Sequence, residues 1–177
     1  MSTDVVTEHG TMFSGANHIC IVTADLDRAV RRWWDRYSVG PWSVFSYDSS
    51  NMQAKVTGRP VDFKMRAALA QLGPAFRLEL IQPLDELSPY ADTLSRAGGA
   101  DHVHHVRLDV PDFARARDQL VSLGLPVRLE ASFTGGSPEH RFQAMYFDAR
   151  DDLGLLLEIG QASAGFSMPE PDYVYPR

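Results

Sequence analysis

The stretch His18-Ile-Cys-Ile-Val-Thr-Ala-Asp-Leu-Asp-Arg-Ala29 is the most informative part of this chain, because it occurs twice. The second copy, 87 residues later, is His105-Val-Arg-Leu-Asp-Val-Pro-Asp-Phe-Ala-Arg-Ala116, and it repeats the histidine, aspartate, arginine and alanine. An apolar segment with one central acid follows each copy, as Arg77-Leu-Glu-Leu-Ile81 and as Leu156-Leu-Glu-Ile-Gly160. Self-similarity at a fixed offset indicates a duplicated structural unit.

Each copy predicts a strand, a helix and then three strands. Asp25 is a typical N-cap, and apolar residues at helical spacing predict a helix from Leu26 to Tyr37. Pro111-Asp112 begins the equivalent helix, which Gly124 ends. The expected strands are 17–23, 42–47, 62–71 and 76–83, then 102–110, 127–133, 141–148 and 155–161, with the last hairpin turns at Gly73-Pro74 and Asp151-Asp152.

These elements divide the chain into five parts. We expect an N-terminal extension at 1–15, a first module at 16–84, a linker with a short helix at 85–101, a second module at 102–162 and a C-terminal arm at 163–177. The arm holds three prolines, so we expect neither helix nor sheet there. Its apolar residues predict an extended segment that lies over the module or over a partner subunit.

Strand alternation places four candidate ligands on one face. Side chains in a strand point to opposite faces with a period of two. In each of these strands, the residues that point to one face are uniformly apolar and should pack beneath the helices. The residues that point to the other face include His18, Glu79, His105 and Glu158. They should therefore line the concave face of the sheet. His104 belongs to the apolar face of its strand, so we do not expect it to be a ligand.

Composition excludes several classes of function. The chain has 177 residues, of which 44% are hydrophobic and 23% charged, as in ordinary globular proteins. No segment approaches the length of a membrane span, and Met1 to Gly15 lacks the features of an export signal. The net charge of −6 argues against nucleic acid as a partner. A single cysteine favours a cytoplasmic location.

At these residues the chain resembles the vicinal oxygen chelate superfamily, which includes glyoxalase I, methylmalonyl-CoA epimerase, extradiol dioxygenases and bleomycin-resistance proteins. The His18 segment, Leu78-Glu-Leu-Ile-Gln-Pro83, the His104-His105 pair and Leu157-Glu-Ile159 are most similar to the epimerase branch. The resemblance implies an α+β fold, with two tandem βαβββ modules forming a cupped mixed eight-stranded sheet and helices outside. In the epimerase the second metal position is commonly glutamine, so Glu79 is closer to the glyoxalase pattern.

The resemblance also implies a cofactor and a reaction. His18, Glu79, His105 and Glu158 would bind one divalent metal ion, and this donor set suits Zn, Co, Ni, Mn or Fe. Asp62 matches the position of the epimerase acid/base carboxylate, and His140 stands at the equivalent place in the second copy. With Glu158, these form the candidate catalytic set.

We therefore expect an isomerase or epimerase that acts on a small carbonyl compound, such as a CoA thioester, through an enolate. The expected assembly is a homodimer without nucleic acid or membrane partners. The alternatives are a glyoxalase I-like lyase, an extradiol-type dioxygenase and a non-catalytic small-molecule-binding protein. One acid and one imidazole on opposite faces of the substrate would make an epimerase, whereas a single base would make an isomerase.

Overall fold

The helices and strands follow the order expected from the duplication. The computed structural model describes residues 11–176, and the first ten residues of the expected N-terminal extension lie outside this range. The elements are β1 (Gly15–Val22), α1 (Leu26–Tyr37), β2 (Trp42–Tyr47), β3 (Met52–Val56), β4 (Arg59–Pro60), β5 (Met65–Leu72), β6 (Phe76–Pro83), α2 (Pro89–Arg96), β7 (His102–Asp109), α3 (Phe113–Ser122), β8 (Val127–Thr134), β9 (Arg141–Ala149), α4 (Arg150–Leu153), β10 (Leu155–Ala162) and β11 (Tyr173–Tyr175).

Helices α1 and α3 begin at equivalent aspartates. The Asp25 side chain accepts a hydrogen bond from the backbone N–H of Arg28, and Asp112 accepts one from that of Arg115. Such a cap satisfies one of the free N–H groups at a helix start. The same local signal therefore turns the chain from strand to helix in both copies, and the predicted bounds of α1 are confirmed.

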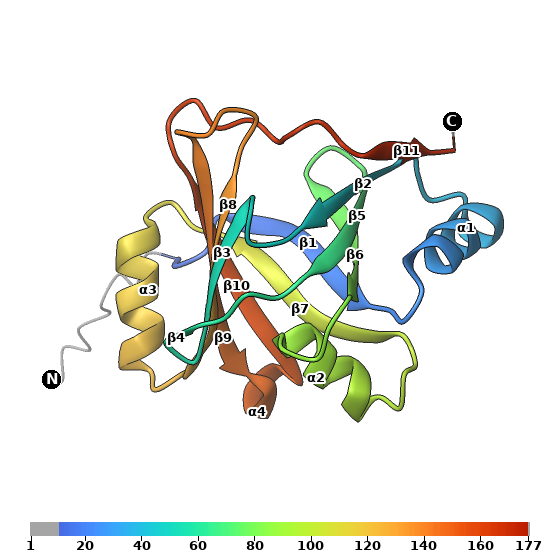
Figure 1. The fold of residues 1–177 in the computed structure, drawn as a ribbon. Coiled ribbons are helices and arrows are strands. Elements are labelled where there is room, and N and C mark those ends of the chain that lie inside the picture. Colours follow the sequence, from blue (N-terminus) through green and yellow to red (C-terminus); the bar gives the residue numbers. More distant parts are fainter. Residues whose placement is uncertain (1–10, 177) are drawn as a thin grey trace, which may run out of the picture.

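Within residues 11–176 the strands form one mixed sheet in the order β11-β2-β5-β6-β1-β7-β10-β9-β8-β3-β4. The first strands of the two copies, β1 and β7, pair antiparallel at its centre, and β6 and β10 pair parallel to them on either side. The sheet curls around an interior, with α1 and α3 on opposite outer sides and α2 near one end (Figure 1). The predicted α+β fold class is confirmed.

In the part of the chain that the structure describes, the sheet has eleven strands rather than the expected eight. Residues 52–60 form β3 and β4, and β3 pairs with β8 of the other module, so Met52 lies opposite Phe133. β5 begins at Met65 rather than at Asp62. A short helix, α4, occupies the expected Asp151-Asp152 turn. The prediction missed β3 because its pairing partner lies about 75 residues away in the sequence.

Strand alternation divides the core as predicted. Leu78 and Leu80 pack beneath α1, whereas Ile81 faces the interior of the curled sheet. Leu157 and Ile159 pack beneath α3. The helices thus cover the uniformly apolar face of these strands, and the residues on the other face line the interior. Among the described residues, no helix has the length and apolar character needed to cross a membrane.

The C-terminal arm crosses the open end of the curled sheet and ends beside β2 (Figure 1). Contrary to the expectation from its prolines, it contains a strand, because Tyr173–Tyr175 lies between prolines and pairs antiparallel with β2. The Tyr173 hydroxyl accepts a hydrogen bond from Arg66 Nη2 at 2.8 Å and donates one to the Asp27 carboxylate. Phe166 packs near Phe142, with ring centroids 5.9 Å apart.

Deletion of residues 166–177 is expected to lower the thermal midpoint by about 5–10 °C. The half-buried rings of Tyr173 and Tyr175 cover the core beneath α1, and loss of their burial should cost roughly 2–3 kcal/mol, at about 2–4 °C per kcal/mol. Scanning calorimetry measures the midpoint. Val174→Thr is the control, because this side chain is 37% exposed and its change should have little effect. An unchanged midpoint after deletion would show that the arm adds no stability.

Candidate metal centre

Side chains from the four central strands converge inside the sheet. His18 comes from β1, Glu79 from β6, His105 from β7 and Glu158 from β10. His18 Nε2 lies 3.1 Å from His105 Nε2. Glu158 Oε2 lies 3.1 Å and 3.0 Å from these two nitrogens, and Glu79 Oε2 lies 3.4 Å and 3.3 Å from them. The structure thus brings together all four residues that the duplication singled out.

The cluster has the chemistry and spacing of a divalent metal site. His18, Glu79 and His105 offer ligand atoms that lie within 4.8 Å of one another. Imidazole nitrogens and carboxylate oxygens bind Zn²⁺ at about 2.0–2.2 Å, so neighbouring ligand atoms lie roughly 3 Å apart. Glu158 Oε2 is buried and has no hydrogen-bond partner among the described residues. A buried carboxylate oxygen without a donor is costly unless a cation neutralises it, so the four residues fit one divalent ion.

The electrostatics of the cluster keep both carboxyl groups ionised. Burial favours their neutral forms, but the imidazoles of His18 and His105 outweigh it and hold the pKa of Glu79 and Glu158 below the ordinary glutamate value. His105 is fully buried and His18 is 4% exposed. The site therefore presents two carboxylates and two imidazoles with little competition from solvent.

A β-bulge precedes each candidate histidine ligand. The pairing of β1 with β7 skips Asn17 on one strand and His104 on the other. Asn17 Oδ1 lies 3.2 Å from His18 Nδ1, and His104 Nδ1 lies 2.8 Å from His105 Nδ1. An amide oxygen only accepts, so His18 Nδ1 donates to Asn17 Oδ1, and Nε2 is the ring nitrogen that faces the cluster.

The two bulge residues thus hold the outer ring nitrogens of the two candidate ligands, as outer partners do in metal sites. Strand alternation assigned His104 to the apolar face, but the bulge at this residue interrupts the alternation. Its ring instead lies against Tyr90 of α2, with centroids 4.5 Å apart. Asn17 and His104 are related by the same 87-residue offset as the two ligands, and this is the sequence signal that could have found them.

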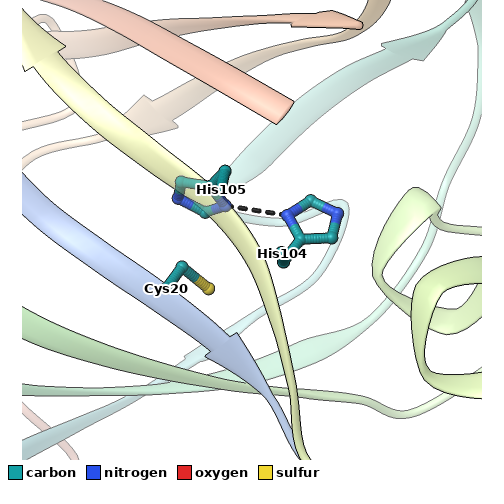
Figure 2. A group of neighbouring side chains, drawn as sticks. All are labelled: Cys20, His104 and His105. Carbon is teal, nitrogen blue, oxygen red and sulfur yellow. Dashed lines mark hydrogen bonds between the residues drawn. The ribbon is translucent and has the colours of Figure 1, made fainter. Parts of the chain in front are cut away.

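Cys20 approaches the same histidines from β1 (Figure 2). Its sulfur and ring nitrogens of His104 and His105 lie within 4.8 Å of one another. Burial raises the pKa of the Cys20 thiol to about 12, and only the thiolate is a strong metal ligand. Cys20 is fully buried and belongs to the apolar core inside the curled sheet.

The two other predicted catalytic residues do not reach the cluster. Asp62 is exposed, in the segment before β5, and lines a separate hollow with Lys55 and Glu130. The His140 ring lies against Gly165 of the arm and does not line the cavity at the cluster. The positions of both residues depend on the path of the chain. The strand β5 begins later than expected, and the loop before β9 turns toward the arm.

A cavity of about 240 Å³ opens over the cluster. His18, Glu79 and Glu158 lie on its wall, together with Arg77 and Arg107. The remaining walls are mainly apolar and come from both modules and from the arm, including Tyr47, Phe133, Phe142 and Phe166. A few polar groups at one end of an apolar cavity are typical of a small-molecule site.

The fold and this centre define a class of protein. The family model of the Glyoxalase/Bleomycin resistance protein/Dioxygenase superfamily matches residues 17–144. This match covers most of the chain, and the chain therefore belongs to that superfamily, as the resemblance implied.

Particular relatives are epimerases. An ethylmalonyl-CoA/methylmalonyl-CoA epimerase from Cereibacter sphaeroides is 33% identical over 93 residues, which cover 50% of this chain and 63% of the relative. The match thus spans less than two thirds of that protein. The methylmalonyl-CoA epimerase structure from Mycobacterium tuberculosis is 21% identical, with a TM-score of 0.59 and coverage of 94% and 95% of the two chains.

A Streptomyces coelicolor methylmalonyl-CoA epimerase variant, solved in complex with 2-nitronate-propionyl-CoA, is 20% identical with a TM-score of 0.62. The comparison covers 86% of this chain and 99% of the other. At these identities, the likeness to both solved structures shows a shared fold.

Proposed function

We propose that the protein is a divalent-metal-dependent isomerase or epimerase that moves a proton next to the carbonyl of a small substrate, with an acyl-CoA thioester as the leading candidate. The observation that carries this proposal is the convergence of His18, Glu79, His105 and Glu158 on one wall of an apolar cavity. The similarity to acyl-CoA epimerases supports the substrate class.

His18, Glu79, His105 and Glu158 would bind the ion. When bound, a divalent ion supplies a Lewis acid that polarises a carbonyl oxygen and acidifies the neighbouring C–H. The apolar walls exclude water from the reacting carbon. His18 and His105 are held by Asn17 and His104 and need no rearrangement to act as ligands.

Glu158 is the proposed base in this structure. It lines the cavity, and its side chain is 3% exposed. Glu79 occupies the equivalent position on the other side of the histidine pair, because β6 and β10 flank β1 and β7. Two carboxylates on opposite sides would allow one to remove a proton and the other to return one to the opposite face, as an epimerase needs.

A glyoxalase I-like lyase is the second candidate. Glu79 favours it, because the resemblance associates glutamate at this position with the glyoxalase pattern. Both reactions share proton transfer next to a carbonyl, so the choice between them depends on the substrate. The homodimer and the cytoplasmic location expected from the sequence stay predictions.

The test is hydrogen exchange in D₂O. We expect the metal-loaded protein to wash deuterium into the α-position of methylmalonyl-CoA or ethylmalonyl-CoA, as followed by NMR. Protein stripped with a chelator should lose this exchange and regain it when the metal is restored. Exchange no faster than in protein-free buffer for both thioesters would contradict the acyl-CoA epimerase, and turnover of a hemithioacetal would then support the lyase.

A further inference from the structure

Two arginines flank the metal centre on neighbouring strands. In the sheet register, His18 lies opposite Arg77 on β6 and opposite Arg107 on β7. Residues directly opposite each other project to the same face of a sheet, and both arginines line the cavity over the cluster. A row of Arg77, His18 and Arg107 therefore crosses the wall of the cavity.

Within residues 11–176 Arg77 has no carboxylate partner, and the only carboxylate near Arg107 is that of Asp109, at the outer limit of an ion pair. Arg77 Nη2 donates to the neutral Asn17 Oδ1 at 2.5 Å. Arg107 Nη2 is 3.9 Å from Asp109 Oδ1, too far for a hydrogen bond. The Arg107 guanidinium lies 4.3 Å from the centroid of the Phe142 ring, and its buried Nε has no acceptor. Unused donors thus remain in a side chain that is only 16% exposed.

The charge balance of the cavity points to an anion. Its charged lining among the described residues comprises Arg77, Arg107, Glu79 and Glu158. A divalent ion held by the two glutamates would neutralise them, which leaves the cavity wall with a positive charge from Arg77 and Arg107 that only Asp109, outside the cavity lining, offsets in part. Guanidinium groups bind carboxylates through paired, charge-assisted hydrogen bonds, and such bonds are stronger when the surroundings exclude water.

We propose that Arg77 and Arg107 form a binding subsite for a substrate carboxylate beside the metal centre. The inference rests on the proposed function and narrows its substrate class to malonyl-type half-thioesters, in which a carboxylate and the thioester carbonyl flank one carbon. The cavity of about 240 Å³ accommodates such an acyl group with a small alkyl substituent. Phe133, Phe142 and Phe166 line the same cavity and offer an apolar surface for that substituent.

The experiment measures binding and needs no turnover. Titration calorimetry compares malonyl-CoA with butyryl-CoA, which lacks the carboxylate, on the metal-loaded protein. We expect Arg77→Gln and Arg107→Gln each to weaken malonyl-CoA binding by about 10- to 100-fold, the range for a lost hydrogen bond to a charged group. Butyryl-CoA binding should change by less than about threefold. Arg59→Gln removes the same charge from the exposed strand β4 and should leave both affinities unchanged.

Metal content and thermal midpoint are measured for each variant. If a glutamine variant does not fold, the corresponding lysine variant replaces it, because lysine keeps the charge and loses the paired geometry. Its expected loss of malonyl-CoA affinity is roughly 3- to 10-fold. Equal losses for both thioesters, or no loss for either, would overturn the subsite. A wild-type protein that selects malonyl-CoA through these arginines but catalyses no exchange would support the subsite and contradict the proposed function.

Discussion

His105→Ala is expected to leave the protein without stoichiometric metal, whereas His104→Ala should still bind one ion per chain. His105 directs Nε2 at His18, Glu79 and Glu158, so its loss removes a ligand from the centre of the cluster. We expect metal affinity to fall by more than about 100-fold, beyond the 10–100-fold typical of outer-shell partners. Metal analysis after dialysis and titration with Co²⁺ measure the two variants.

His104→Ala tests the orienting role separately. The His104 ring is hydrogen-bonded to His105 Nδ1 and lies against Tyr90. We therefore expect the affinity for the metal ion to fall by about 10–100-fold, with unchanged stoichiometry at saturating metal. Asn17→Ala is the matched variant, because Asn17 holds His18 in the same way from the other bulge. If His104→Ala loses the ion and His105→Ala keeps it, the roles of the two residues are reversed.

Glu158→Gln should reduce α-proton exchange by about 10²–10⁴-fold, the usual contribution of general acid–base catalysis. The amide keeps a ligand oxygen but cannot accept a proton, so exchange is compared at equal metal occupancy. Asp62→Asn is the control, because Asp62 is exposed and lines a different hollow. We expect this variant to exchange at the wild-type rate.

The opposite result is equally informative. Loss of exchange in Asp62→Asn with metal retained, and normal exchange in Glu158→Gln, would restore the base that the resemblance implied. His140→Gln is measured beside them. Loss of exchange in only one stereochemical direction in that variant would assign His140 the second proton transfer of an epimerase.

Much of the architecture could be predicted because its signals are local. The caps at Asp25 and Asp112 and the helical spacing after them begin α1 and α3. The alternation around Glu79 separates Leu78 and Leu80 from the interior. These features depend on residues within a few positions of one another, so one strand or helix is enough to reveal them.

The convergence of the four candidate ligands could be predicted for a related reason. The duplication pairs His18 with His105, and Glu79 with Glu158, and strand parity assigns them to one face. The sequence is enough for this prediction, because equivalent strands of two related modules bring equivalent residues to the same place. The sequence by itself therefore determined the family, the duplicated order of elements and the four side chains that could hold a metal ion.

Only the tertiary structure decided which other groups reach that site. The bulges at Asn17 and His104 are shifts in the pairing of β1 with β7, and they interrupt the alternation from which the face of His104 was predicted. Arg77 and Arg107 flank His18 because of register across three strands, while the paths of the chain into β5 and β9 leave Asp62 and His140 outside the cavity. Register and loop path depend on contacts between segments far apart in the sequence, and no local pattern of residues encodes them.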